Sequence, residues 1–515
     1  MAVVTIYGGE PMRFEYDSPA LLADLLNIGH RPADMPCGKQ GRCGKCKVRA
    51  FGLLSPISDT ERAALSEEEI ALGYRLACRA MAVGDVEIYP EAKRQEQILT
   101  DFTLPESEHT KGEGYGIAID IGTTTLAAYI YDMASGEVAA IRTMPNPQRA
   151  FGADVTNRLK ASIEGQGETL KKAVTEAISE LAGEYKAEIK TAVITGNTAM
   201  LYLLTGEKVE SITYAPFKPS TLMGRYTDGG DAGLQEGTSV WLPHCISAYV
   251  GADITCGMVF GMTKSEFSRK PLMLADIGTN GEMALFTGDR ILTCSTAAGP
   301  AFEGAGITCG MTASEGAISR VYVEKGKLCY DVIGGGRALG ICGSGLVDAV
   351  AVLLDLGIVD DTGRLLMSGH SYTENMLEIG GQPAYRFPNS EILLTQGDVR
   401  ALQLAKGAIC GGMLTLIEEA GLACEDITAL QIAGGFGSYI DPKSAARIGL
   451  IPKALAKKVS LLGNGAGAGA SMMLIDERYR DIGKNLSEKC ETVELSTSAV
   501  FFEKYVDCMA IGEME

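Results

Sequence analysis

Histidine and long apolar runs are scarce in this chain of 515 residues, and each shortage excludes a class of function. The four histidines, His30, His109, His244 and His370, lack metal-ligand spacing, which argues against histidine-based catalysis. No apolar run reaches the roughly 18 residues that span a bilayer. The N-terminus lacks the basic start, apolar stretch and small-residue cleavage site of a signal peptide. We therefore expect a cytoplasmic protein with no membrane partner.

Positive charge is also in short supply. The chain has 46 Lys and Arg against 65 Asp and Glu, a formal net charge of −19. A surface of this sign repels a phosphate backbone, so no nucleic-acid partner is expected. Hydrophobic residues make up 46% of the chain, as in ordinary globular proteins, and its length exceeds what one hydrophobic core usually fills. The sequence thus predicts several folded units.

Four of the fourteen cysteines, Cys37, Cys43, Cys46 and Cys78, follow the pattern Cys-x5-Cys-x2-Cys-x31-Cys. Zinc sites usually combine two short cysteine hooks, whereas the fourth cysteine here is solitary. Three thiolates from one glycine-rich loop and a distant fourth are typical of a plant-type [2Fe–2S] cluster. A zinc hook or four unrelated thiols is the alternative. The other ten cysteines show no ligand spacing, and we expect them to pack in the interior.

The segments around the cysteine loop resemble the β-grasp layout of ferredoxins over residues 1–92. We expect a strand hairpin, then a helix with Ser18 as N-cap, Pro19 at its first position and Gly29 as its stop. A capping box at residues 66–69 precedes the fourth cysteine, and a strand ends the domain. The charge of five basic residues around the loop is expected to offset that of the cluster: Lys39, Arg42, Lys45, Lys47 and Arg49.

Residues 93–114 are polar and lack apolar periodicity, which predicts a linker that lets the first domain move. An internal repeat follows this linker. GIAIDIGTTTLAAYIYD (116–132) and LMLADIGTNGEMALFTGD (272–289) share an apolar strand, Asp-Ile-Gly-Thr and a second strand. This form differs from a P-loop, whose glycines lead into a helix and end in Gly-Lys-Ser/Thr.

The repeated turn has the chemistry of a phosphate site. Glycine lets backbone N–H groups approach phosphate oxygens, and threonine hydroxyls add donors. Asp120 and Asp276, at the ends of the two strands, suit a Mg²⁺ ion held through its waters. For one copy alone, a tight hairpin with a capped turn explains the residues equally well.

Three further segments favour a nucleotide site. TAVITGNTAM (191–200) and LLGNGAGAGASMM (461–473) run from apolar residues through a Gly-Asn turn into a helix. ALQIAGGFGSYID (429–441) ends a strand in glycines that leave room for an adenine ring. Together with the repeat, these segments resemble the five nucleotide motifs of the acetate and sugar kinase, heat-shock chaperone and actin (ASKHA) superfamily.

The superfamily resemblance covers residues 115–515 and implies an actin-like ATPase core, with ATP and Mg²⁺ between two ribonuclease H-like lobes. The first lobe is expected at about 115–260, the second at about 270–462, and a return helix to the first at about 463–480. With the ferredoxin-like domain, this makes a multidomain protein of the α/β and α+β classes.

Two glycine-rich segments, 295–307 and 340–350, are further candidates for ligand contact, although plain helix caps explain them equally well. Glu282 and Glu303 are the acidic residues that we would test first for orienting an attacking water. The alternative for each is a glutamate that is merely solvated.

An ATPase core joined to a one-electron carrier makes sense where nucleotide energy drives an electron to an acceptor that is hard to reduce. With its cysteine loop, linker and the segments DIGTTT, ITGN, DIGTNGE, GPAFEG, ICGSG and GGFG, the chain resembles the reductive activators of corrinoid proteins. The resemblance implies that cobalt in a corrinoid protein is reduced from Co(II) to Co(I), coupled to ATP hydrolysis, in anaerobic methyl transfer. It also implies a reductant protein or another low-potential electron donor, and a homodimer.

The site residues expected on this basis form three groups. The four cysteines hold the [2Fe–2S] cluster, and Asp120 and Asp276 position Mg²⁺. The expected nucleotide contacts are Gly122, Thr123, Thr124, Thr125, Asn197, Gly278, Thr279, Asn280, Gly434, Gly435 and Gly437.

Two other functions stay open at this point. One is a small-molecule kinase of the same superfamily, with the ferredoxin domain as a redox brake. The other is a non-enzymatic redox sensor in which ATP binding selects the partner. Activators of dehydratases and of benzoyl-CoA reductase have similar cores, but they hold a [4Fe–4S] cluster across a dimer, which the cysteine spacing disfavours.

Overall fold

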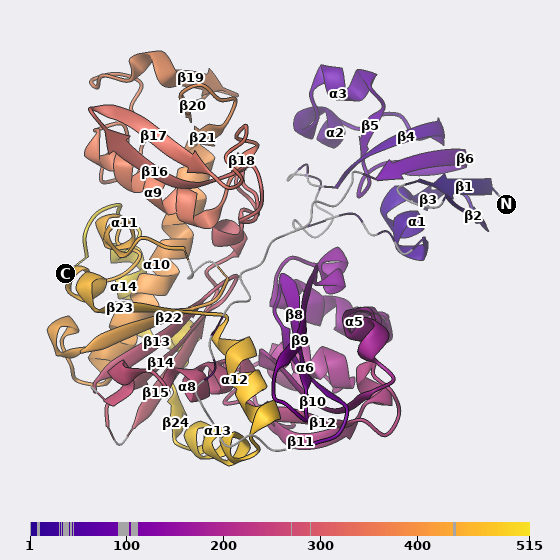
Figure 1. Ribbon diagram of the computed structural model, residues 1–515. Coiled ribbons are helices and arrows are strands. Elements are labelled where there is room, and N and C mark those ends of the chain that lie inside the picture. Colours follow the sequence, from indigo (N-terminus) through magenta and orange to yellow (C-terminus); the bar gives the residue numbers. More distant parts are fainter. Residues whose placement is uncertain are drawn as a thin grey trace. The chain divides into compact units, whose positions relative to one another are not determined.

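The computed structural model describes residues 2–7, 11–29, 31, 33, 35, 41, 44, 46–90, 102, 104, 112–268, 270–288, 290–435 and 439–514 (Figure 1). The contacts within the chain divide it into two compact units. We call Met1–Gln95 with Asn146–Ala173 the N-terminal unit, and Glu96–Pro145 with Val174–Glu515 the core unit. Within the described ranges, no helix is both long and apolar enough to cross a bilayer.

The N-terminal unit contains a six-stranded sheet and three short helices that follow its strands. The strands are β1 (Ala2–Ile6), β2 (Met12–Tyr16), β3 (Ala20–Leu21), β4 (Lys47–Leu54), β5 (Tyr74–Leu76) and β6 (Met81–Pro90), and the helices are α1 (Leu22–Ile28), α2 (Asp59–Ala64) and α3 (Glu67–Ala71). The order is β2-β1-β6-β4-β5, with β3 on β6, and β1 runs antiparallel to β2 and parallel to β6. The predicted β-grasp layout is confirmed.

The first helix begins later than its sequence pattern predicted. Ser18 is not its N-cap and Pro19 is not its first residue, because Ala20–Leu21 pairs with β6 as a short strand and α1 starts at Leu22. Ladder hydrogen bonds to the sheet outweigh the local capping signal here. Gly29 does end α1, and the predicted capping box is present at the start of α3.

A second stretch of chain belongs to the N-terminal unit. It comprises η1 (Pro147–Phe151), α4 (Val155–Ala161), η2 (Ser162–Gln166) and the first turns of α5 (Gly167–Ala182). Ala150 is buried in the same hydrophobic cluster as Leu22 and Leu26 of α1, and Phe151 packs against that cluster. This stretch therefore shares a hydrophobic core with the β-grasp sheet.

The core unit contains two large sheets of the same design. The first has β7 (Tyr115–Ile121), β8 (Thr125–Asp132), β9 (Val138–Pro145), β10 (Ile189–Gly196), β11 (Met223–Asp228) and β12 (Ser239–His244), and the second has β13 (Leu272–Ile277), β14 (Gly281–Phe286), β15 (Ile291–Thr296), β22 (Ala429–Ala433), β23 (Val459–Gly463) and β24 (Cys490–Thr492). Each sheet begins with three antiparallel strands, β7-β8-β9 in the first and β13-β14-β15 in the second. Two further strands extend the sheet beside β7 or β13 and run parallel to it: β10 and then β12 in the first sheet, and β22 and then β23 in the second. This repeated ribonuclease H-like order confirms the two lobes that the internal repeat implied.

Besides the later turns of α5, nine α-helices lie in the described part of the core unit. They are α6 (Thr198–Thr205), α7 (Glu210–Thr213), α8 (Ala252–Gly261), α9 (Gly343–Asp355), α10 (Gln396–Glu419), α11 (Pro442–Arg447), α12 (Gly465–Ile475), α13 (Arg478–Glu488) and α14 (Ala499–Asp507). Two small sheets complete the unit: β16 (Ala317–Glu324), β17 (Lys327–Val332) and β18 (Gly340–Ile341), and β19 (Met376–Ile379), β20 (Gln382–Arg386) and β21 (Leu393–Thr395).

Helix α12 follows the last long strand of the second sheet and packs against β7, β10 and α8 of the first lobe (Figure 1). Its close approach to α8 depends on Gly469, because a Cβ there would lie 2.0 Å from the Cys256 carbonyl oxygen. The two lobes are thus joined by a tightly packed helix pair.

Two residues of the predicted linker, Phe102 and Leu104, pack against the core unit, although the polar composition of the segment gave no sign of this. The ring of Phe102 lies 4.8 Å from that of Tyr129 and 6.0 Å from that of Phe260, measured between centroids. Phe102 and Leu104 both pack against the hydrophobic cluster that α8 and α12 share. That the linker lets the first domain move stays a prediction.

Candidate functional site

The two Asp-Ile-Gly-Thr turns face one cavity in the core unit. Each turn joins two antiparallel strands, β7 to β8 and β13 to β14, so the predicted strand–turn–strand form is confirmed. Gly122 has to be glycine, because a Cβ there would lie 2.7 Å from the Thr125 carbonyl oxygen. The cavity is lined by these predicted residues: Asp120, Gly122, Thr123, Thr124, Thr125, Asn197, Asp276, Gly278, Thr279, Asn280, Glu282, Glu303, Gly434 and Gly435.

Five acidic side chains line this cavity: Asp120, Asp253, Asp276, Glu282 and Glu303. Burial and neighbouring carboxylates raise the pKa of each of the three aspartates to about 7, and that of Glu282 well above its ordinary value. An amide from Asn464 donates to Asp120 Oδ2 at 3.0 Å. Among the described lining residues none is Lys or Arg. A cluster of acids without a cation is typical of a site that binds one.

Asp253 is a residue that the sequence analysis missed. It lies in the first turn of α8, after Gly251, whose backbone approaches the start of α6 so closely that a Cβ would lie 2.3 Å from the Asn197 Cα. The signal in the sequence was only Gly-Ala-Asp before an apolar helix. Its importance depends on contacts with strands far away in the chain, which no local pattern reveals.

The acidic cluster fits a magnesium ion held mainly through water. No group of three described His, Cys, Asp or Glu side chains is placed to coordinate a metal directly. Mg²⁺ usually keeps several of its waters and takes one or two carboxylates together with phosphate oxygens. Asp120 and Asp276 occupy the same position in the two repeats, and they are the residues that would hold the magnesium ion.

Glu282 and Glu303, the two glutamates considered for orienting an attacking water, lie in different parts of the cavity lining. Glu282 is buried in β14 opposite Asp276, and its Oε2 lies 3.5 Å from the Gly251 N–H nitrogen. Glu303 accepts hydrogen bonds from the Thr279 N–H (3.1 Å) and hydroxyl (2.8 Å), and from the Thr124 hydroxyl. Glu303 therefore contacts both Asp-Ile-Gly-Thr turns, whereas Glu282 lies within the acidic cluster.

Glycine-rich backbone also lines the cavity, close to Asp276. Gly434 has a positive φ of 96°, and a Cβ there would lie 2.6 Å from the Ile277 carbonyl oxygen. Tyr439 lines the cavity beside this turn, and so do Gly343 and Ser344 at the start of α9. The weaker candidate segments, 295–307 and 340–350, thus both reach the cavity; Gly437 lies outside the described residues.

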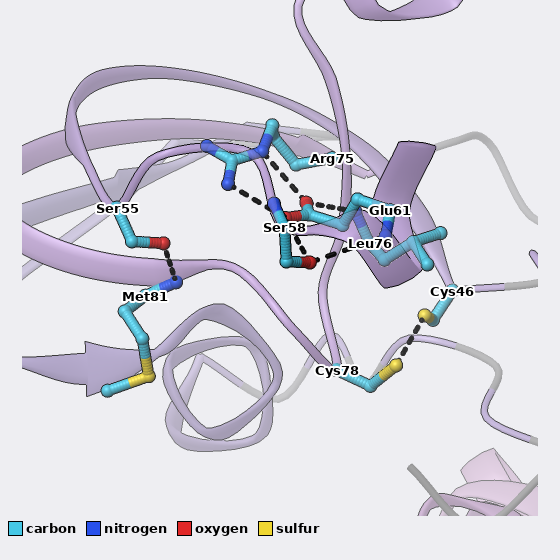
Figure 2. A network of polar contacts seen from close by, with 8 residues as sticks. All are labelled: Cys46, Ser55, Ser58, Glu61, Arg75, Leu76, Cys78 and Met81. Atoms are coloured by element: carbon cyan, nitrogen blue, oxygen red, sulfur yellow. Dashed lines mark hydrogen bonds and ion pairs between the residues drawn. The ribbon is translucent and has the colours of Figure 1, made fainter. Parts of the chain in front are cut away.

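In the N-terminal unit, two of the four predicted cluster ligands come together. The Sγ atoms of Cys46 and Cys78 lie 3.2 Å apart, and both side chains are buried (Figure 2). The Ala77 N–H donates to the Cys46 carbonyl at 2.9 Å, which aligns the two chain segments. Cys37 and Cys43 lie outside the described residues. Two facing thiols from the loop and from the distant fourth position fit a [2Fe–2S] cluster, for which the four cysteines would supply the ligands.

A buried ion pair supports this pair of cysteines. Glu61 is fully buried and accepts hydrogen bonds from Arg75 Nε (2.9 Å) and Nη2 (3.1 Å) and from the Leu76 N–H (3.2 Å), as Figure 2 shows. Burial raises the pKa of Glu61, but the hydrogen bonds and charge of Arg75 and the capping contact of Ser58 together lower the pKa by more. The net shift of the Glu61 pKa is therefore downward. The pair ties α2 to β5, the strand just before Cys78.

Two of the five basic residues expected to offset the cluster have other contacts. Lys47 forms an ion pair with Glu69 at 2.5 Å, and the Arg49 guanidinium stacks over the rings of Phe51 and Tyr89. Lys39, Arg42 and Lys45 lie outside the described residues. Of the ten remaining cysteines, seven are buried and three are half-buried, which agrees with the packing role predicted for them.

Two ribonuclease H-like lobes, with one Asp-Ile-Gly-Thr turn from each facing one cavity, define an ASKHA-type core, here joined to a ferredoxin-like β-grasp sheet. Family models agree with this class: residues 115–265 match the RACo middle region, and residues 270–515 match the C-terminal domain of RACo, the ASKHA domain. The chain belongs to the family of reductive activators of corrinoid proteins.

Individual relatives support the assignment. The chain is 36% identical over 440 residues to the corrinoid activation enzyme RamQ of Eubacterium limosum, covering 81% of this chain and 73% of that protein. It is 28% identical over 433 residues to the [Co(II) methylated amine-specific corrinoid protein] reductase of Methanosarcina barkeri, covering 76% of each. A solved reductive activator for corrinoid, iron–sulfur protein aligns with a TM-score of 0.71 at 28% identity, over 99% of this chain and 98% of that one.

Proposed function

We propose that this protein reductively activates a corrinoid protein in an ATP-dependent reaction. One electron reduces cobalt of the partner from inactive Co(II) to Co(I), and hydrolysis of ATP in the core unit is coupled to that transfer. A [2Fe–2S] cluster held by the four cysteines would supply the one-electron carrier. A reductant protein or another low-potential electron donor would reduce the cluster again. The active form is a homodimer.

The observation that carries this proposal is the joint presence of the paired cysteines and the acidic two-turn cavity in a chain of this family. The magnitudes are compatible with coupling. For one electron, about 59 mV uphill costs about 1.4 kcal/mol. A switch from 1:99 to 99:1 needs about 5.5 kcal/mol of differential binding, equivalent to roughly 230 mV.

The cavity lining supports the following roles for the chain's own residues. Asp120 and Asp276 position Mg²⁺, and their turns donate backbone N–H and hydroxyl groups to the β- and γ-phosphates, with Asn197 beside them. Gly434, Gly435 and Gly437 border the adenosine. Glu282, Glu303 and the newly found Asp253 are the acids that we propose for work on the attacking water.

Anaerobic absorption spectroscopy tests the proposal. Co(II) corrinoid protein, a reductant and this protein are mixed with or without ATP, and the Co(I) band is followed. We expect the band only with ATP, and not with an Asp120→Ala variant. A Co(I) band that is the same in both mixtures contradicts ATP coupling.

The two competing functions make different predictions in the same assay. A small-molecule kinase with a redox brake releases ADP with a metabolite substrate and without any cobalt acceptor. A redox and ATP sensor shows negligible hydrolysis even with the corrinoid protein present.

A further inference from the structure

Glu303 joins the two phosphate turns across the cavity. Its Oε2 accepts a hydrogen bond from the Thr124 hydroxyl, in the turn after β7. The same oxygen accepts a second one, at 2.8 Å, from the Thr279 hydroxyl in the turn after β13. Its Oε1 accepts the Thr279 N–H at 3.1 Å. The two hydroxyl oxygens lie 3.4 Å apart. A single carboxylate thus holds the two lobes together at their phosphate turns.

The groups that donate to Glu303 are of the kind that bind phosphate. Two hydroxyls and a backbone N–H beside a glycine turn are neutral donors that suit any oxyanion. A carboxylate and a phosphate both only accept here, and both are negatively charged. They therefore compete for the same donors and repel each other at close range.

Two glycines bound the segment that carries Glu303. The short helix η6 (Pro300–Glu303) is flanked by Gly299 and Gly304, with φ of 78° and 76°. Both values are in the left-handed region, where glycine bends the chain without strain. The Gly299 N–H also donates to the Thr279 carbonyl at 2.9 Å, and η6 packs against α9 and α10 of the second lobe. A displaced Glu303 therefore shifts a segment in contact with the body of that lobe.

We propose that Glu303 is a latch that makes the cavity discriminate between nucleoside triphosphate and diphosphate. The inference rests on the proposed ATP binding and adds a step before hydrolysis. A terminal phosphate that is to be bound by both turns has to take over the donors of Thr124 and Thr279 and expel the carboxylate. A diphosphate, which lacks that group, leaves the latch in place. Release of the latch transmits the presence of the γ-phosphate to η6.

Nucleotide-binding measurements on Glu303→Ala and Glu303→Gln test the latch. A non-hydrolysable ATP analogue and ADP, each with Mg²⁺, are titrated calorimetrically, so that any role of Glu303 in hydrolysis does not affect the result. Removing a charged acceptor that competes for these donors should tighten analogue binding on the order of tenfold in Glu303→Ala, with a smaller gain in Glu303→Gln. The affinity for ADP should change less than about twofold. Circular dichroism and thermal melts confirm that both variants fold, and Glu324→Ala is the matched control.

The outcomes separate the latch from the proposed function. If the unaltered protein binds the analogue but Glu303→Ala binds it equally or more weakly, the latch is wrong and ATP binding stands. Equal tightening for both nucleotides also overturns the latch, because it shows no discrimination. Absence of any nucleotide binding by the unaltered protein overturns both.

Discussion

Buried acidic side chains are treated in opposite ways in the two units. In the N-terminal unit, Glu61 is fully buried, but Arg75 pairs with it through two hydrogen bonds, and its pKa lies below the ordinary value. In the core unit, Asp120, Asp253 and Asp276 have no basic residue among the described cavity lining, and burial with mutual repulsion raises the pKa of each to about 7.

The difference distinguishes a structural acid from functional ones. The Glu61 pair is complete within the protein, so it fixes the strand before Cys78 and needs nothing from outside. The cavity acids repel each other until a cation arrives, so the fold keeps them at a cost in stability that a bound metal offsets. An acid that lowers stability is retained for binding or chemistry.

The largest expected effect comes from removing a cavity acid that we propose positions Mg²⁺. Asp120→Ala should lower ATP turnover about 10³-fold, because the metal and the phosphates lose their alignment. The visible spectrum of the cluster should stay intact, since the paired cysteines lie in the other unit. Phosphate release under anaerobic conditions measures turnover, and Asp481→Ala on the exposed side of α13 is the control. Retained turnover removes Asp120 from the site.

Breaking the paired acid should affect the other unit. Glu61→Ala leaves the Arg75 charge buried without its partner, which costs about 3–5 kcal/mol. We expect a lower melting temperature and loss of iron from the purified protein, with ATP turnover per folded molecule unchanged. Glu68→Ala, an exposed neighbour on α3, should do neither. Unaltered iron content in Glu61→Ala contradicts a positioning role for the pair.

Replacing a cavity acid by its amide should change stability in the opposite direction: it should stabilise the protein. Asp253→Asn removes one charge from a cluster of like charges, so we expect the protein without Mg²⁺ to gain about 1–3 kcal/mol in stability at pH 8. Turnover should fall, because the acid is no longer there to act on water. Glu61→Gln, the same kind of change at the paired acid, should lower stability. If both amides destabilise the protein, the contrast between the units fails.

The smallest effect is a pH dependence that follows from the same contrast. The aspartate pKa values near 7 lie above those of the unfolded chain, about 4. Their protonation therefore stabilises the folded protein fully below pH 4, and this contribution is lost as pH rises through 7. Without divalent cations, the melting temperature should fall by about 1 °C for each kcal/mol lost between pH 6 and 8, because the core unit is large and its entropy of unfolding grows with its length. Added Mg²⁺ and nucleotide should reverse the loss, and Asp253→Asn should flatten it. A melting temperature that rises over this range contradicts the shifts.

Local sequence patterns were reliable where chemistry is confined to a short segment. The two Asp-Ile-Gly-Thr turns and the capping box before α3 each depend on neighbours within a few residues, and their local structures are as predicted. The pattern at Ser18 and Pro19 was equally local and proved wrong, because a two-residue strand on β6 decided that segment. The anchor of Phe102 in a polar linker was missed for the same reason.

The sequence by itself determined the class of fold, the repeat and most of the residues that line the cavity, because hydrophobic periodicity and glycine turns act over short distances. Only the tertiary structure decided which acids have no basic residue beside them in the described cavity lining, that Asp253 joins Asp120 and Asp276, and that Glu303 bridges Thr124 and Thr279. Charge repulsion and hydrogen-bond competition depend on distances in space, and residues more than a hundred positions apart come within reach only when both sheets are folded.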